Sequence, residues 1–246
     1  MATLLIDLGN TRIKWAWMRG AGLGDYDAHE HHGQPLASLQ PLWQQAPQRV
    51  LINSVLGPDL QAQIQASAEP FGLTLHWATS SDSFEGLRNG YRQPAQLGSD
   101  RWLGMIAAQQ NNPGRCLCVV SCGTAVTIDA ISPQGKHLGG MILPGLRLMQ
   151  QSLKQGTRQV DAQEQNEPPQ MLADHTSAAV HAGCHYGVVG AISQMLAKVS
   201  VEYNEIVKCI VTGGDAEKIR PLLEARETEH RPHLVLEGLA LWGKDK

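Results

Sequence analysis

The chain has 246 residues, of which 42% are hydrophobic and 17% are charged, and it is long enough to bury a sizeable core. A formal net charge of -3 excludes a broad basic surface for nucleic acid. No basic leader precedes a long apolar segment, and no apolar run approaches the roughly 20 residues of a membrane helix. We therefore expect a cytoplasmic protein with neither nucleic-acid nor membrane partners. The five cysteines lack paired C-x-x-C spacing, which predicts reduced thiols and no zinc site.

The first predicted element is a β-hairpin around a glycine turn. The apolar run Leu4 to Leu8 predicts a buried strand, Gly9-Asn10-Thr11 is typical of a turn, and the alternation from Arg12 to Trp17 predicts the return strand. The turn places Asp7 and Lys14 beside short polar groups, a set that suits a phosphate with its magnesium. The alternative is an ordinary hairpin in which Asp7 bonds only the turn backbone.

The segments that follow complete a first βββαβα unit. An edge strand is expected near Tyr26, and the neighbouring His29, His31 and His32 are interpreted as solvated because they show no ligand spacing. The remaining predicted elements of this unit are a helix over Leu36 to Gln45, a strand over Arg49 to Val55, a helix from Pro58 that ends at Pro70 to Gly72, and a strand over Leu73 to Trp77.

A further helix is predicted to begin at Ser99 and Asp100, after the turn-rich segment from Asn89. Either residue makes a good N-cap, which is a sufficient structural role. A helix N-terminus also favours anions, so Asp100 could accept a hydroxyl proton while Arg101 neutralises charge on an acceptor or on a transferring phosphoryl group. The sequence leaves both roles open.

The second half repeats the first weakly. Leu117 to Asp129 again combines an apolar strand, a polar residue, a glycine turn and an alternating strand. Thr157 to Gln170 is polar and is predicted to be a mobile loop. The other predicted elements are a strand over His137 to Ile142, a helix marked by Leu146 to Leu153, a long helix over Asp174 to Tyr203, a strand over Val207 to Thr212, a helix over Ala216 to Ala225, a strand over Leu234 to Leu236 and a terminal helix.

Two such units predict an α/β fold of two ribonuclease-H-like (actin-like ATPase) domains, residues 1–114 and 115–246, whose glycine turns face each other across a cleft. No P-loop or dinucleotide glycine motif follows a strand. Gly213-Gly214-Asp215 either lines the nucleotide end or caps the next helix. Small residues from Ala178 to Ala191 permit close helix packing, across domains or across a dimer interface.

The order of these motifs resembles the type III pantothenate kinases, members of the acetate and sugar kinase/Hsc70/actin superfamily, over essentially the whole chain. The matching motifs are Asp7-Leu8-Gly9-Asn10-Thr11 with Lys14, Asn89-Gly90-Tyr91 through Pro94, Leu97-Gly98-Ser99-Asp100-Arg101, Gly123-Thr124-Ala125, Gly139-Gly140-Met141-Ile142-Leu143-Pro144-Gly145 and Thr176-Ser177-Ala178-Ala179-Val180. The resemblance implies ATP-dependent phosphorylation of pantothenate to 4'-phosphopantothenate, which begins coenzyme A biosynthesis. Alternatives are a kinase of the same fold for another small hydroxylated substrate, or a non-catalytic nucleotide-binding regulatory protein.

The resemblance also implies roles for individual residues. ATP would bind at Asp7, Leu8, Gly9, Asn10, Thr11, Arg12, Ile13, Lys14 and Thr124, with Asp7 as the ligand of Mg²⁺. Pantothenate would bind at Tyr91, Gly98, Ser99, Asp100, Arg101 and Thr176, with Asp100 as the catalytic base and Thr176 reaching the neighbouring subunit's substrate in a homodimer.

One position departs from the family's pattern. The family commonly has aspartate where this chain has Ser121, and that carboxylate is associated with a monovalent cation, usually potassium. Either backbone and hydroxyl oxygens suffice here, or dependence on K⁺ or NH₄⁺ is weakened or lost.

Overall fold

The structure is a computed structural model that describes residues 2–20, 22–157 and 167–245. The chain divides into two compact units, Met1–Asn111 with His233–Lys246, and Asn112–Pro232. Each unit contains one five-stranded sheet, with the orders β3-β2-β1-β4-β5 and β10-β9-β8-β11-β12. In both sheets the first three strands are antiparallel and the last two are added in parallel. The repeated topology agrees with the predicted fold class of two ribonuclease-H-like domains.

The first unit carries the opening hairpin. Its strands are β1 (Thr3–Leu8), β2 (Arg12–Arg19), β3 (Gly22–Glu30), β4 (Arg49–Ser54) and β5 (Leu75–Trp77), with a small hairpin of β6 (Ser83–Phe84) and β7 (Leu87–Arg88). Its helices are α1 (Pro35–Trp43), α2 (Pro58–Ala68), α3 (Ser99–Asn111) and α7 (Leu234–Trp242), with short 3₁₀ turns at Glu69–Phe71, Pro94–Gln96 and Gly243–Asp245.

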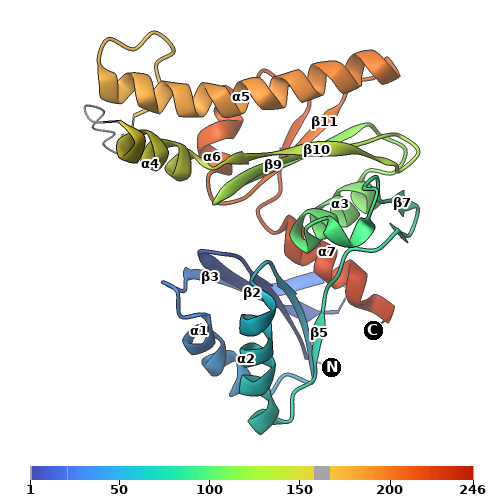
Figure 1. Cartoon of the computed structure of the whole chain (residues 1–246). Coiled ribbons are helices and arrows are strands. Elements are labelled where there is room, and N and C mark those ends of the chain that lie inside the picture. The colour runs from blue at the N-terminus through green and yellow to red at the C-terminus, as the bar shows by residue number, and fades with distance from the viewer. Residues whose placement is uncertain (1, 21, 158–166, 246) are drawn as a thin grey trace. The chain divides into compact units, whose positions relative to one another are not determined.

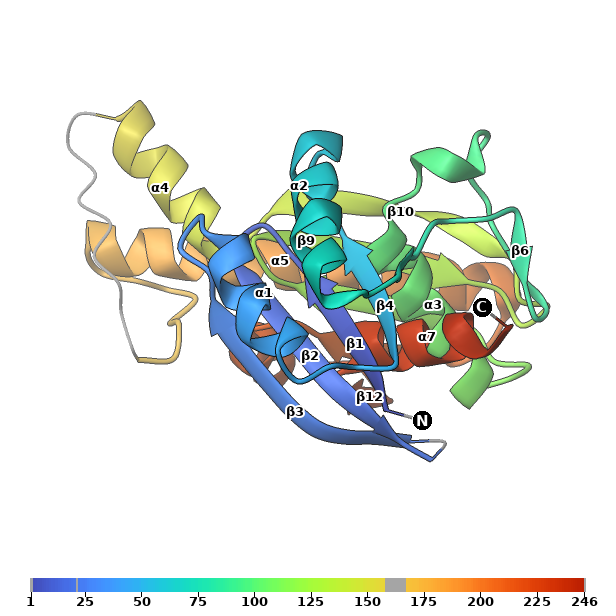
Figure 2. The same cartoon turned by 90° about the horizontal axis from the view of Figure 1, so that it is seen from below.

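Helices cover both faces of this first sheet, so the central strand β1 is buried along its whole length. Figure 2 shows α1 and α2 over one face, where Leu39, Trp43 and Ile64 pack against Leu4 and Ile6. On the other face, α7 packs against β1 and β4 and runs beside α3 (Figure 1). The side chain of Asp7 lies on the α7 side, because residues alternate between the two faces of a strand.

The C-terminal helix belongs to the first unit, which differs from the predicted division at residues 1–114 and 115–246. Gly238 lets α7 approach α3 closely, since a Cβ there would overlap the carbonyl oxygen of Leu103. The predicted strand over Leu234 to Leu236 is wrong, because these residues form the first turn of α7. Three consecutive apolar residues are too few to distinguish a strand from a helix. The largely apolar segment continues to Trp242 as a helix buried on one side.

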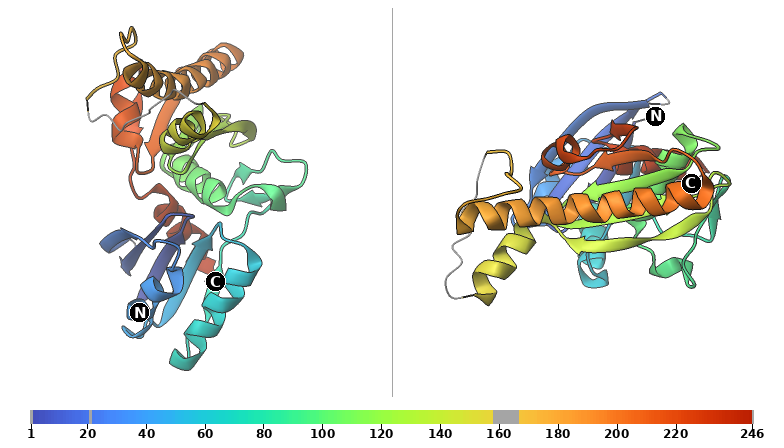
Figure 3. Two further views of the ribbon diagram at one scale, coloured as in Figure 1. Left: turned by 60° about the vertical axis from the view of Figure 1, so that its left-hand side comes forward. Right: turned by 90° about the horizontal axis from the view of Figure 1, so that it is seen from above.

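The second unit repeats the arrangement around β8. Its strands are β8 (Leu117–Cys122), β9 (Ala125–Ile131), β10 (His137–Pro144), β11 (Lys208–Thr212) and β12 (Thr228–His230), and its helices are α4 (Leu146–Gly156), α5 (Thr176–Tyr203) and α6 (Ala216–Ile219). Figure 3 shows α5 running along the sheet that contains β9 and β10. Cys118, Val120 and Cys122 of β8 enter the core that α5 covers.

One predicted helix of the second unit is shorter than expected. The helix predicted over Ala216 to Ala225 ends at Ile219 and gives way to a 3₁₀ turn, Arg220–Leu222, because Pro221 cannot donate a helical hydrogen bond. Most of the loop predicted from Thr157 to Gln170 lies outside the described residues. The other predicted helices and strands are present. In the described part of the chain, no helix has the length and apolar character to cross a membrane.

Candidate functional site

The glycine turn and its two charged residues form the base of the candidate site. Asp7 and Lys14 are direct partners in the antiparallel register of β1 and β2. Lys14 Nζ lies 3.8 Å from Asp7 Oδ2, and Asp7 is only 8% exposed. The backbone N–H of Gly9 donates to the carbonyl oxygen of Arg12 at 3.0 Å, which closes the turn. The hairpin therefore presents a nearly buried carboxylate beside a cation, as predicted.

Asn53, which the sequence analysis missed, connects this hairpin to helix α3. Asn53 is fully buried on β4, directly beside Asp7 in the parallel register. Its Nδ2 donates to Asp7 Oδ1 at 2.8 Å, and its Oδ1 accepts a hydrogen bond from the Ser99 hydroxyl at 2.6 Å. Ser99 is the first residue of α3. The hairpin around Gly9 and the start of α3, which both contain predicted site residues, are thus joined by one amide.

Asp100 follows Ser99 in the first turn of α3. Its Oδ1 accepts a hydrogen bond from the backbone N–H of Arg101 at 2.8 Å. This oxygen would lie only 2.7 Å from a Cβ at position 98, so Gly98 leaves room for the carboxylate to fold back. The contact explains why glycine precedes the candidate base. It also shows that Asp100 has a local structural bond in addition to any chemical role.

Arg101 and Tyr91, which the resemblance assigns to one substrate site, are in direct contact. Arg101 Nη1 donates to the Tyr91 hydroxyl at 2.7 Å, and the guanidinium carbon lies 5.5 Å from the centre of the Tyr91 ring. Arg101 is 7% exposed. A guanidinium held by a hydrogen bond and by an aromatic face keeps a fixed direction, which suits recognition of a carboxylate or a phosphate.

His31 is a second residue that the sequence analysis misjudged, because it is buried and not solvated. The backbone N–H of Gly33 donates to its Nδ1 at 3.2 Å, so Nδ1 is the acceptor and Nε2 carries the proton. Nε2 donates to the carbonyl oxygen of Gly9 at 3.0 Å, and the His31 backbone N–H donates to that of Thr11 at 3.2 Å. The position of His31 in the sequence could have indicated this role, because His31 directly follows β3, the edge strand that pairs with β2.

His31→Leu is expected to weaken ATP binding in the presence of Mg²⁺, because the turn loses the ring hydrogen bond that holds Gly9. A lost hydrogen bond of about 1–2 kcal/mol corresponds to roughly a 5–30-fold higher dissociation constant. Isothermal titration calorimetry measures the change. The matched control is His32→Asn, since His32 has an 81% exposed side chain and a φ of 47° that asparagine tolerates. Equal affinities for His31→Leu and His32→Asn would contradict the role of the ring.

The second glycine turn lies between β8 and β9 in the other unit. The backbone N–H of Gly123 donates to the carbonyl oxygen of Ala125 at 3.0 Å, and Thr124 is exposed. Gly145 and Gly213 both approach this turn so closely that a Cβ would overlap its backbone. The predicted glycine motifs of this half therefore gather around one turn.

Ser121 occupies the position in β8 that Asp7 occupies in β1. Its cross-strand partners are Thr127 on β9 and Thr212 on β11, in the places that Lys14 and Asn53 take beside Asp7. The second unit thus surrounds the equivalent position with hydroxyl groups, where the first has a carboxylate, an amine and an amide. Next to Ser121, burial and then the charge of Asp215 raise the pKa of the Cys122 thiol to about 12, so Cys122 is no nucleophile at neutral pH.

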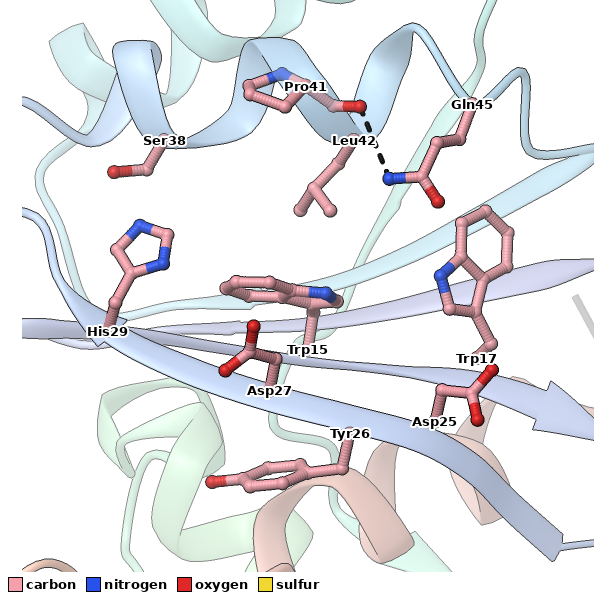
Figure 4. A pocket seen from close by; sticks show the side chains of 10 residues that line it. All are labelled: Trp15, Trp17, Asp25, Tyr26, Asp27, His29, Ser38, Pro41, Leu42 and Gln45. Carbon is pink, nitrogen blue, oxygen red and sulfur yellow. Dashed lines mark hydrogen bonds between the residues drawn. The ribbon is translucent and has the colours of Figure 1, made fainter.

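A cavity of about 450 Å³ in the first unit is separate from this site. Its lining includes Trp15, Trp17, Asp27 and His29 from β2 and β3, with Leu42 from α1 above them (Figure 4). Trp15 and Trp17 alternate with Lys14 along β2, so the cavity opens on the face opposite to Asp7. It contains none of the predicted site residues.

The predicted residues are divided between the two units. Asp7, Lys14, Tyr91, Gly98, Ser99, Asp100 and Arg101 all belong to the first unit, whereas Thr124 and Thr176 belong to the second. Within the second unit, Thr176 is exposed at the first residue of α5.

A model of the family described as type III pantothenate kinase matches residues 3–198, a span that contains every predicted site residue. The chain belongs to this family. A type III pantothenate kinase from Nitrosococcus oceani is 38% identical, with 98% of this chain and 94% of the relative covered. One from Azoarcus sp. is 37% identical, with 97% and 89% covered. The resemblance inferred from the motifs is confirmed.

Solved structures support the fold alone. A conserved protein from Campylobacter jejuni, described by its assignment to the Baf family, has a TM-score of 0.59 at 20% identity, with 96% of this chain and 94% of that chain covered. An activator of 2-hydroxyisocaproyl-CoA dehydratase from Clostridium difficile, solved with bound ADPNP, has a TM-score of 0.56 at 13% identity, with 100% and 95% covered. The likeness spans both units of this member of the type III pantothenate kinase family.

Proposed function

We propose that this protein transfers the terminal phosphoryl group of ATP to pantothenate, giving 4'-phosphopantothenate, the first step of coenzyme A biosynthesis. The observation that carries the proposal is the continuous set of contacts from Asp7 and Lys14, through Asn53, to Ser99 at the start of the helix with Asp100 and Arg101. These contacts would hold a nucleotide-binding turn and an acceptor-binding helix in a fixed arrangement, and phosphoryl transfer depends mainly on such positioning. Family membership supports the choice of pantothenate.

The nucleotide end of the site has the donors that a phosphate and a magnesium ion need. Magnesium is usually held by one or two carboxylates together with substrate phosphates, and Asp7 is a suitable carboxylate because its Oδ1 is already oriented by Asn53. Mg²⁺ would neutralise phosphate charge when bound. Lys14 and backbone N–H groups of the turn that follows Gly9 would hold the phosphates, and Thr124 of the second unit would add a contact.

The acceptor end would be formed by residues of the first unit. Tyr91 and Arg101 would hold pantothenate, and Arg101 suits its carboxylate because a guanidinium can bind both oxygens. Asp100 would accept the proton of the substrate hydroxyl as that oxygen attacks the phosphorus of the terminal phosphoryl group. Ser99 and Gly98 would position Asp100, by the contacts described above.

We extend the proposal to a homodimer in which Thr176 reaches the substrate of the partner subunit. Two large apolar residues just before α5 support it, since Met171 is 67% exposed and Leu172 is 92% exposed. Burying such side chains in an interface is favourable. Sedimentation velocity should show a dimer, and only monomer at working concentration would remove Thr176 from a shared site.

We also propose that a monovalent cation contributes to activity, but that the requirement for it is weak. Hydroxyl groups at Ser121, Thr127 and Thr212 offer oxygen atoms without the charge of a carboxylate. We therefore infer that activity depends on K⁺ or NH₄⁺ less than it would with an aspartate. The five cysteines are free and buried, which supports placing the enzyme in the reducing cytoplasm.

A coupled assay of ADP release tests the function directly. Purified protein with Mg²⁺ and ATP should form ADP only when pantothenate is added, and the assay is run with and without K⁺ or NH₄⁺. A panel of sugars and small hydroxy acids separates pantothenate kinase from a kinase for another substrate. If pantothenate produces no ADP under any of these cation conditions, the proposed function is wrong. Nucleotide binding without turnover of any substrate would favour the regulatory alternative.

A further inference from the structure

Asn53 is a buried polar residue at the end of β4 whose two hydrogen bonds both lead to proposed site residues. It is fully buried, and its side chain lies between the carboxylate of Asp7 and the hydroxyl of Ser99. Buried amides are usually retained only where their hydrogen bonds are satisfied. The amide of Asn53 either only completes the core or also fixes the orientation of Asp7 and Ser99.

The two partners allow one orientation of the amide. An ionised carboxylate only accepts hydrogen bonds, so the NH₂ group of Asn53 must face Asp7. The oxygen then faces Ser99 and accepts from its hydroxyl at 2.6 Å. One oxygen of Asp7 is thereby held by Asn53, and the other is the one that lies 3.8 Å from Lys14 Nζ. Asn53 consequently decides which carboxylate oxygen is directed away from β4.

The second unit provides an internal comparison. Thr212 takes the position of Asn53, and it stands beside Ser121 where the first unit has Asp7. The amide is therefore present in the unit that has a carboxylate to orient, and a hydroxyl replaces it in the unit that has none.

We propose that Asn53 is a positioning residue that couples the carboxylate of Asp7, the proposed ligand of Mg²⁺, to the first turn of α3, and so to Asp100. The inference rests on the proposed function, because it concerns the same site. Asn53 touches neither substrate in this account. It acts on the nucleotide through Asp7 and on the acceptor through Ser99.

Asn53→Leu is the first test, because it nearly keeps the size and branching of the side chain and removes the donor to Asp7. Calorimetric binding of ATP with Mg²⁺, without pantothenate, should be at least about 10-fold weaker than wild type, as for loss of a supporting partner of a metal ligand.

The matched control is Ile52→Val, a neighbouring position on β4 whose side chain lies in the core on the opposite face. It should lower the melting temperature without changing the affinity for ATP with Mg²⁺.

Asn53→Ala and Ser99→Ala separate the two arms of the proposed coupling. Asn53→Ala should weaken ATP binding and also lower kcat/KM for pantothenate. Ser99→Ala should lower kcat/KM for pantothenate while leaving the affinity for ATP with Mg²⁺ within about 2-fold of wild type, since the bond from Asn53 to Asp7 survives. In the double variant, Ser99→Ala should have less effect than in the wild-type background.

The outcomes distinguish the coupling from a purely structural role and from failure of the proposed function. If Asn53→Leu and Asn53→Ala only lower the melting temperature, as Ile52→Val does, Asn53 is structural and the inference is wrong. Additive effects in the double variant would also overturn it. If wild-type protein fails to phosphorylate pantothenate but ATP binding is weakened in Asn53→Leu, the function fails and the orientation of Asp7 by Asn53 stands. Should Asn53→Leu not fold, the Asn53→Ala and Ser99→Ala cycle decides.

Discussion

Asp100→Asn is expected to lower kcat by about 10²–10⁴-fold, the range typical of a lost general base. Asparagine has the same shape, and its side-chain oxygen can still accept the backbone hydrogen bond that Asp100 accepts from Arg101. It cannot take the proton of the substrate hydroxyl. Steady-state ADP release at saturating ATP and pantothenate measures the change, and circular dichroism checks that the fold is retained.

The same substitution tests the capping role against the catalytic one. Asparagine and aspartate serve about equally well at a helix N-terminus, so a residue needed only for capping would tolerate the change. Unchanged turnover in Asp100→Asn would therefore return Asp100 to a structural role. Asp82→Asn, at an exposed aspartate in the loop between β5 and β6, is the matched control and should leave kcat within about 2-fold of wild type, as expected for a surface change.

Asp7→Ala is expected to lower kcat/KM for ATP by about 10³-fold or more, because a metal-binding carboxylate supplies several kcal/mol of charge stabilisation. The loss should be accompanied by a higher requirement for Mg²⁺. Ser121→Ala, at the equivalent position of the second unit, should cost less than about 10-fold, since it removes one neutral hydroxyl group. Titration of Mg²⁺ at fixed ATP compares the two variants.

The pair of substitutions tests the asymmetry between the two hairpins. Asp7→Asn separates charge from shape, because it keeps the size of the side chain and loses the carboxylate. If Asp7→Asn behaves like wild type, or if Ser121→Ala is as damaging as Asp7→Ala, the metal does not depend on the first hairpin alone.

Much of the fold could be predicted from the sequence because it depends on nearby residues. The alternation in β2 and β9 and the glycines after β1 and β8 predicted two hairpins, and the repeat of that pattern predicted two similar sheets. The motif order predicted the family. The polar strand β12 was missed because Thr228–His230 has no alternating apolar signal.

The site was predicted less completely, for a related reason. Tyr91 and Arg101 could be assigned to one substrate site in advance, since both belong to motifs that the family shares, but their contact could not. Asn53 and His31 carried no such mark, although one is fully buried and the other holds the turn. A single polar residue at the end of a strand does not change the periodicity of that strand, so its role depends on what lies beside it.

The sequence alone was enough to predict the hairpin around Gly9, the repeated unit and the family. Turns and strand periodicity depend on residues that are neighbours in the chain. Three features required the folded structure. They are the return of α7 to the first unit, the bonds from His31 to the turn, and the bridge from Asp7 through Asn53 to Ser99. Each joins residues far apart in sequence, and strand pairing and tertiary packing bring such residues within hydrogen-bonding or packing distance.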